Sequence, residues 1–279
     1  MYNLFDQKLI NGAKMPHPLI TQADIESFKN DGVILVKGLF ADYVEDLRQG
    51  LAYNMQNPGP YAAENLKASE NGRFFDDYCN WQRVPEFENT VRQSPAAAVA
   101  ADLMSSNRVQ MFHDHILIKE PGTSKPTPWH QDSPYYFVDG VQNVSFWSPL
   151  DSVTNASLRC VAGSHKWPKP VLPTRWLAED SFYPNDDDYM PVPDPDAEAM
   201  EIREWAMEPG DAVAFNFSIL HGARGNETTS RRRAFSLRLV GDDARFVARP
   251  GNTSPPFPGH NMLPGQRLRE DWFPVIFER

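Results

Sequence analysis

Short runs of apolar and β-branched residues recur along the chain between turn-forming residues, and this pattern predicts β-strands. The longest run covers residues 109–120, where His113 and His115 alternate with Asp114 and therefore lie on one face of the strand. Further strands are predicted at residues 33–36, 144–150, 212–217 and 233–240.

Three helices are predicted before residue 108. Thr21 and Asp24 have the spacing of an N-cap and the third helical residue, and an apolar face follows them. Apolar residues recur at helical spacing over residues 42–55. The third helix is predicted to run to Met104, with Ser94 as its cap and Pro95 at its first position.

Strands with flanking helices predict a mainly β fold, and 279 residues are enough for one all-β barrel with decorations. The acidic, proline-rich residues 173–200 are either a solvated loop or, at a barrel mouth, a lid. We expect a single domain, residues 1–279, composed of a tail (1–20), a helical flank (21–108), a barrel core (109–245) containing the lid-like insertion, and a C-terminal extension (246–279).

The composition narrows the class of protein. A hydrophobic fraction of 41% with 23% charged residues is typical of a soluble globular chain. The formal net charge of −10 argues against nucleic acid and anionic membranes as partners, because both require a basic surface. Cys79 and Cys160 lack metal-site spacing and are expected to be free thiols. Without a signal peptide or an 18-residue apolar stretch, the expected location is cytoplasmic.

The segment Pro128-Trp129-His130-Gln131-Asp132 is the first candidate for chemistry. In an extended strand residues i and i+2 share a face, so His130 and Asp132 can bind one metal ion together. An imidazole and a carboxylate are two of the three ligands of the 2-His-1-carboxylate facial triad, which leaves positions on iron for a co-substrate and oxygen. The spacing alone is a weak signal.

A second candidate segment lies about ninety residues later. A Pro-Gly-Asp turn and an apolar strand lead to His221, which precedes a glycine. The link over residues 225–230 has hairpin-turn composition and brings His221 near Arg231, Arg232 and Arg233. A guanidinium there can hold a carboxylate by paired hydrogen bonds. Strand alternation directs either Arg232 or its two neighbours inward. A metal ligand beside such an arginine suits 2-oxoglutarate.

These residues resemble a known family. His130-Gln131-Asp132, His221-Gly222 and Arg232 eleven positions after that histidine resemble the phytanoyl-CoA dioxygenase family of iron(II)/2-oxoglutarate oxygenases. Residues 31–38 resemble its opening strand, and the stretch from Asn155 to Lys166 resembles its middle signature. The resemblance extends from about residue 20 to about residue 245.

The resemblance implies a fold, a set of cofactors and residue roles. The fold is a double-stranded β-helix (jelly-roll, cupin-like) barrel, and the chemistry uses Fe(II), O2 and 2-oxoglutarate. Decarboxylation of 2-oxoglutarate to succinate and CO2 is coupled to hydroxylation of an unactivated C–H bond; desaturation and epoxidation stay open. By analogy His130, Asp132 and His221 bind iron, Arg232 binds the distal carboxylate, and Gln131 and Trp147 line the 2-oxoglutarate pocket. The chain departs from the family at Ala223, where serine is frequent.

Other readings stay open. His113 and His115 form a competing metal pair, although no third ligand is tied to them in the sequence. Lys119 is either a surface lysine or a contact to the co-substrate. A zinc hydrolase also uses two histidines and a carboxylate, and a non-catalytic small-molecule-binding barrel is a further alternative. The expected substrate is a small polar or amphipathic metabolite, and the candidates for an anionic group on it are Arg83, Arg159, Arg238 and Arg245.

Overall fold

The computed structural model describes residues 9–10, 13–154, 158–177, 180–183 and 187–279. Its larger sheet has the strand order β3-β12-β9-β14-β6-β5-β4, and β16 pairs with β6. Every neighbouring pair in this sheet is antiparallel. The strands are β3 (Val33–Val36), β12 (Ala212–Phe215), β9 (Asn143–Pro149), β14 (Arg232–Val240), β6 (Arg108–Lys119), β5 (Phe74–Tyr78), β4 (Ala63–Glu64) and β16 (Val275–Glu278).

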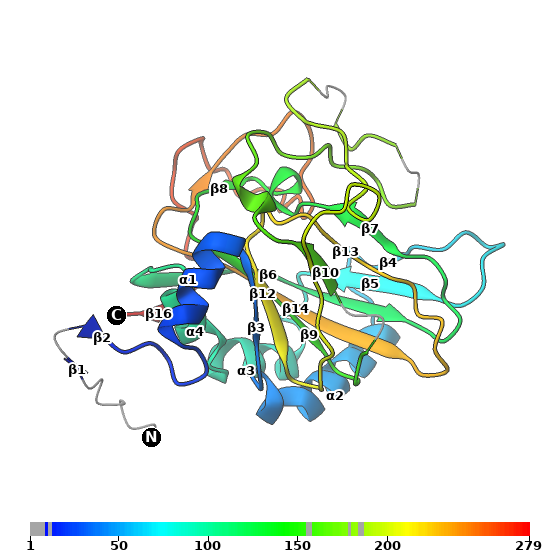
Figure 1. Cartoon of the computed structure of the whole chain (residues 1–279), viewed down its shortest axis with the longest axis horizontal. Coiled ribbons are helices and arrows are strands. Elements are labelled where there is room, and N and C mark those ends of the chain that lie inside the picture. Colours follow the sequence, from blue (N-terminus) through cyan, green and yellow to red (C-terminus); the bar gives the residue numbers. More distant parts are fainter. Residues whose placement is uncertain (1–8, 11–12, 155–157, 178–179, 184–186) are drawn as a thin grey trace.

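A smaller antiparallel sheet has the order β11-β10-β13-β7. The two sheets together form the double-stranded β-helix, so the expected mainly β, cupin-like jelly roll is confirmed (Figure 1). The strands of the smaller sheet are β11 (Ile202–Arg203), β10 (Leu158–Val161), β13 (His221–Ala223) and β7 (Thr127–His130); two-stranded ladders pair β1 (Leu9–Ile10) with β2 (Ala13–Lys14) and β15 (Arg245–Phe246) with β8 (Val138–Asp139).

Helices cover the outer side of the larger sheet (Figure 1). Thr21 caps the first helix, because its hydroxyl accepts from the Asp24 amide at 3.2 Å while the Asp24 carboxylate accepts from the Thr21 amide at 2.8 Å. None of the described helices is long and apolar enough to cross a membrane. The helices are α1 (Gln22–Asp31), α2 (Val44–Gln56), α3 (Pro85–Gln93) and α4 (Ala96–Leu103), with short 3-10 turns η1 (Ala41–Tyr43), η2 (Ser133–Tyr135) and η3 (Ser164–Lys166).

The prediction for the third helix was wrong in its cap. The N-cap of α4 is Pro95, and Ser94 instead ends α3, a helix that was not predicted. The Ser94 amide donates to the Thr90 carbonyl oxygen, which closes α3 immediately before α4 begins. Two helices therefore meet where the pattern indicated the start of one.

Strand alternation sorts the side chains of β14 between the two faces of the larger sheet. Phe235 and Leu237 pack into the cluster under the helices, whereas Arg232 and Arg238 line a cavity inside the barrel. Arg233 lies on the outer side, where its guanidinium pairs with Asp151. The sequence left open whether Arg232 or its two neighbours point into the barrel, and in the structure it is Arg232.

Candidate metal centre

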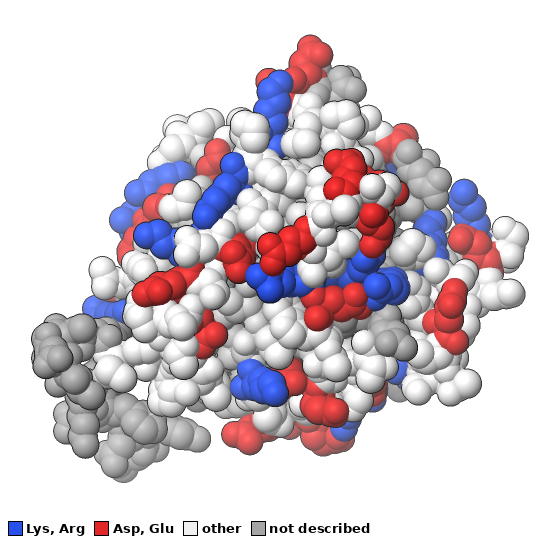
Figure 2. Space-filling model, in the orientation of Figure 1, with Lys and Arg blue, Asp and Glu red and all other residues white. Residues whose placement is uncertain are grey.

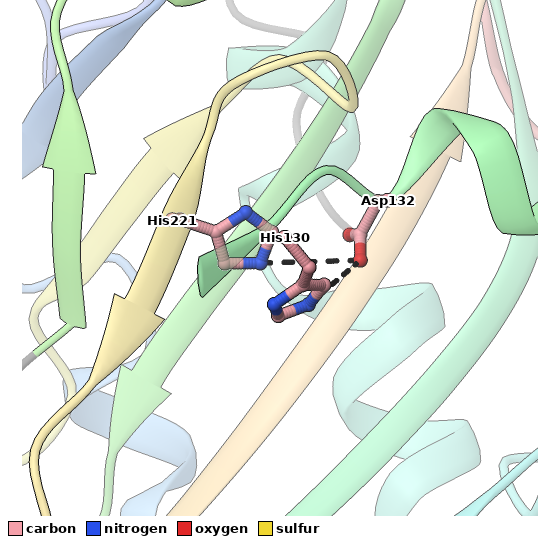
Figure 3. Close-up of side chains that lie close together, drawn as sticks. All are labelled: His130, Asp132 and His221. Carbon is pink, nitrogen blue, oxygen red and sulfur yellow. Dashed lines mark ion pairs between the residues drawn. The ribbon is translucent and has the colours of Figure 1, made fainter. Parts of the chain in front are cut away.

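Three potential metal ligands meet where the two strands β7 and β13 pair in the smaller sheet. His130 ends β7 and His221 begins β13, and the two residues are direct partners in the antiparallel ladder. Asp132 follows β7 after one residue and precedes the turn η2. Figure 3 shows both imidazoles directed at the Asp132 carboxylate. Residues far apart in the sequence thus share one point in space.

The distances fit a metal ion. Asp132 Oδ1 lies 3.7 Å from His130 Nε2 and 3.9 Å from His221 Nε2. One ligand atom from each residue lies within 4.8 Å of the other two, and no other such group occurs in the described part of the chain. A metal at roughly 2.0–2.2 Å from each ligand holds neighbouring donor atoms roughly 3.0–3.5 Å apart. The two distances to Asp132 therefore need to shorten by less than about 1 Å each.

Backbone carbonyl groups orient both imidazoles. His130 Nδ1 lies 2.8 Å from the Pro128 carbonyl oxygen, and His221 Nδ1 lies 2.9 Å from that of Ile219. Because a carbonyl oxygen only accepts hydrogen bonds, each Nδ1 carries the proton and each Nε2 presents a lone pair. A second partner of this kind fixes the tautomer and ring orientation of a metal-binding histidine.

Asp132 is buried and is held ionised by its surroundings. Ser145 Oγ donates to Asp132 Oδ2 at 3.2 Å, and Arg238 Nε lies 3.4 Å from the same oxygen. Burial favours the protonated acid, but Arg238 and the two histidines outweigh it and hold the pKa of Asp132 below its usual range. The carboxylate is therefore available to a cation at neutral pH.

Acid should destabilise the metal-free protein through its buried histidines. Burial and the neighbouring His221 lower the pKa of His130 to about 3, and burial and Arg238 lower that of His113 well below its usual value. These histidines bind protons near pH 6.5 in the unfolded chain but stay neutral in the folded chain. The free energy of unfolding therefore has its full value above that pH and falls below it, by about 1.4 kcal/mol per pH unit for each such histidine. Urea unfolding of the metal-free protein from pH 7 to pH 4.5 measures the slope. His113→Leu should reduce this slope. An unchanged slope would show that His113 does not contribute to the pH dependence.

A cavity of about 240 Å³ extends from the three ligands to both sides. At one end it is lined by Arg232 and Lys119, and Trp147 also faces it. Only 6% of Arg232 is exposed, and burial lowers its pKa to about 10, so it stays charged at neutral pH. The insertion contributes Trp176, whose ring lies 5.2 Å from the His130 ring. A buried cation and the metal ligands thus line the same cavity.

Gln131 is not among the residues that line this cavity, so the structure does not support its expected place in the 2-oxoglutarate pocket. It lies between His130 and Asp132 and points to the opposite side of the chain, as alternation requires. Its side chain donates to the Ser218 carbonyl oxygen at 2.6 Å and accepts from the Val171 amide at 2.9 Å. Gln131 therefore connects the two metal-ligand segments from behind.

The competing pair on β6 lines the cavity without joining the three ligands. His115 Nε2 lies 2.7 Å from Asp76 Oδ2, and Asp76 also accepts from Asn65 at 2.5 Å. His113 Nδ1 bonds to the Asp114 carbonyl oxygen at 3.1 Å. His115 is thus held by Asp76 and His113 Nδ1 by a backbone carbonyl oxygen, whereas His113 Nε2 is buried without a hydrogen-bond partner among the described residues.

Of the four arginines considered for an anionic group, only Arg238 reaches the cavity. Arg159 pairs with Asp196 at the surface, Arg83 donates to Asn80, and Arg245 donates to backbone carbonyl groups. The partnership of Arg238 with Asp132 was not predicted. The spacing in the sequence could have indicated that Arg238 faces inward. Arg238 lies six residues after Arg232 on the same strand, and an even spacing places both side chains on one face.

Known proteins share sequence similarity with most of this chain. The family model described as Phytanoyl-CoA dioxygenase (PhyH) matches residues 28–234. The peroxisomal phytanoyl-CoA dioxygenase of Rattus norvegicus is 26% identical over 250 residues, which cover 81% of this chain and 70% of that protein. Dioxygenase lolE1 of Epichloe uncinata is 25% identical over 244 residues, which cover 81% of this chain and 84% of that protein.

A solved structure supports the fold. The crystal structure of the epimerase SnoN in complex with Fe3+, alpha ketoglutarate and nogalamycin RO matches with a TM-score of 0.72 and 20% identity. The match covers 91% of this chain and 99% of that chain. At this identity the likeness concerns the arrangement of the barrel.

Proposed function

This chain belongs to the phytanoyl-CoA dioxygenase family, and from that premise we propose that His130, Asp132 and His221 hold the iron of an Fe(II)/2-oxoglutarate-dependent dioxygenase. The activity class and the cofactors, iron, 2-oxoglutarate and O2, follow from the family. The assignment of the three residues rests on one observation: they are the group of metal-binding side chains whose donor atoms converge, and they do so inside the cavity that Arg232 lines.

The bound iron and 2-oxoglutarate would supply the oxidising chemistry, with release of succinate and CO2. The protein's part is to bind and orient. His130 and His221 present Nε2 lone pairs and Asp132 adds a charged oxygen, so these three residues would hold the iron at the wall of the cavity. We assign Arg232 to the distal carboxylate of 2-oxoglutarate, and Trp147 to the wall beside it.

The other half of the cavity supports a small substrate of low net charge. Its ionisable groups already have partners in the cavity wall, since Arg238 lies against Asp132 and His115 bonds to Asp76. Tyr61 and Tyr78 form a stacked wall with ring centres 5.0 Å apart. We propose hydroxylation of a C–H bond of a small molecule with an apolar or cyclic body, bound under the insertion that carries Trp176.

The surface gives no separate support for a polyanionic ligand. Figure 2 shows acidic and basic side chains intermingled on the face that it draws, and the formal net charge is −10. Cys79 and Cys160 are both free thiols, which supports the proposal of a reducing, cytoplasmic location.

An anaerobic titration tests the proposed site. Addition of iron(II) and then 2-oxoglutarate should produce a weak visible charge-transfer band that requires both. Arg232→Met should weaken 2-oxoglutarate binding by about 10- to 100-fold, because a charged hydrogen bond to a carboxylate contributes about 1.5–3 kcal/mol.

Arg231→Met is the matched control for this titration. Arg231 is the adjacent arginine, but it is exposed and pairs with Glu120, so its removal should leave the band unchanged. Absence of the band in the unaltered protein, together with tight zinc binding, would favour a hydrolase instead.

A further inference from the structure

His115 lies inside the barrel with one ring nitrogen open to the cavity. Along β6, His115 and Leu117 line the cavity, whereas Ile116 and Ile118 pack into the core under the helices. His115 Nε2 bonds to Asp76 at 2.7 Å. Its Nδ1 has no hydrogen-bond partner among the described residues, and the protein does not shut this atom off from solvent. Because His115 lines the cavity, a ligand there can reach Nδ1.

Asp76 determines which nitrogen of His115 carries the proton. Only 5% of Asp76 is exposed; its Oδ1 accepts from Asn65 Nδ2 at 2.5 Å, and its Oδ2 lies 2.7 Å from His115 Nε2. An ionised carboxylate only accepts hydrogen bonds, so Nε2 carries the proton. In a neutral imidazole the other nitrogen is then an acceptor. His115 therefore presents the lone pair of Nδ1 to the cavity.

An aromatic wall surrounds this acceptor. Tyr78 is the direct partner of His115 in the ladder between β5 and β6, and its ring meets the imidazole edge-on with centres 5.5 Å apart. Tyr61 stacks on Tyr78, and the Tyr78 hydroxyl is already bonded to Ser254 Oγ at 3.2 Å. Ligand sites of this kind bind an apolar body and recognise it by a few placed polar groups. The wall thus suits an apolar ligand that carries one hydrogen-bond donor.

The surrounding charges select the kind of donor. A hydroxyl and an ammonium group can both donate to Nδ1. An ammonium group buried there would need a carboxylate partner, because an unpaired buried charge is costly. The two carboxylates that line the cavity are engaged, Asp76 by Asn65 and His115, and Asp132 by Arg238. A hydroxyl group needs no opposite charge and is therefore favoured.

We propose that His115 selects the primary substrate, its Nδ1 accepting a hydrogen bond from a hydroxyl group of a neutral molecule whose apolar body packs against Tyr61 and Tyr78. This inference rests on the proposed function, since it names the substrate class of the same site. Asp76 is a positioning residue, because it acts through His115. A substrate without this hydroxyl should bind about 3- to 10-fold more weakly, as expected for one neutral hydrogen bond.

Nitrogen-15 NMR of the histidine rings tests the proposal in the zinc-loaded protein with 2-oxoglutarate bound, since zinc is diamagnetic. The His115 signals should show a protonated Nε2 and an unprotonated Nδ1. Cyclohexanol should shift the Nδ1 signal in a saturable manner. It should also bind about 3- to 10-fold more tightly than cyclohexanone, which has the same ring but only accepts hydrogen bonds.

Two variants separate the acceptor from the shape of the cavity. His115→Phe keeps a ring without an acceptor, so the two probes should bind with equal affinity. In Asp76→Asn the new oxygen should stay with Asn65 Nδ2, and the new amide should donate to His115 Nε2. The proton then moves to Nδ1, and cyclohexanone should bind at least as tightly as cyclohexanol.

His113 provides the matched control on the same strand. It also lines the cavity, but its unpartnered Nε2 is buried. His113→Phe should therefore change the affinities for both probes together and leave their ratio as it is. A ratio that is lost in His113→Phe and kept in His115→Phe would overturn the proposal.

A protonated Nδ1 in the unaltered protein, no saturable shift with cyclohexanol, or equal affinities for the two probes would also overturn the role of His115. Each of these results leaves the proposed function intact if iron(II) and 2-oxoglutarate give the charge-transfer band. Absence of the band would instead reject the proposed function. Asp76→Asn, which is nearly isosteric, keeps the test valid if His115→Phe does not fold.

Discussion

Replacement of His221 by leucine should abolish iron(II) binding and oxygenase turnover, whereas the same replacement of His113 should leave iron binding intact. The two histidines are matched in exposure and in the partner of Nδ1. Each is 3% exposed, and each bonds through Nδ1 to a backbone carbonyl oxygen. Only His221 directs its Nε2 toward Asp132 and His130.

The expected loss at His221 is large. Removal of a partner that merely supports a metal ligand costs about 10–100-fold in metal affinity, and removal of a ligand itself should exceed that range. Iron content after anaerobic reconstitution and 2-oxoglutarate-dependent succinate formation are the measurements. Loss of iron from His113→Leu but not from His221→Leu would place the metal on β6 and reject the proposed site.

The local pattern of the sequence singles out the three residues that the structure brings together. Residues i and i+2 share a face of a strand, so His130 and Asp132 are a candidate pair by their spacing. The hairpin composition after His221 placed an arginine near it. Alternation left two choices for the arginine run, and tertiary structure selects between them: Arg233 finds Asp151 outside the barrel, and Arg232 lies inside.

Features that depend on pairing between distant strands were not predictable. Lys119 and Arg232 lie 113 positions apart in the printed sequence, and only the register of β6 against β14 makes them neighbours. The same register places Arg238 opposite His113 and within reach of Asp132. A single sequence carries no signal for register between strands so far apart, because local propensity is indifferent to the partner strand.

For Gln131, strand alternation and the family resemblance point to different sides of the chain. Its neighbours His130 and Asp132 face the cavity, so alternation alone directs Gln131 away from it. The structure has it bonded to Ser218 and Val171 on the far side. Adjacency to metal ligands in the sequence does not imply a shared cavity.

Replacement of Arg238 by methionine should destabilise the metal-free protein by about 3–5 kcal/mol, the usual cost of leaving one charge of a buried pair without its partner. Arg238 is 5% exposed; its Nε donates to Tyr136 at 2.7 Å and lies 3.4 Å from Asp132 Oδ2. Without it, burial should dominate and raise the pKa of Asp132. Urea unfolding at pH 7 measures the loss.

A bound metal should relieve most of this loss, because a divalent cation on Asp132 replaces the missing positive charge. The unfolding free energies of the Arg238→Met and unaltered proteins should therefore converge when zinc, which is redox-inert, occupies the site. Arg233→Met is the matched control on the same strand. Its partner Asp151 is partly exposed, so its removal should cost no more than about 1 kcal/mol, with or without metal. Equal losses for the two variants, or a loss at Arg238 that zinc does not relieve, would show that Arg238 acts by packing and not by balancing the charge of a metal ligand.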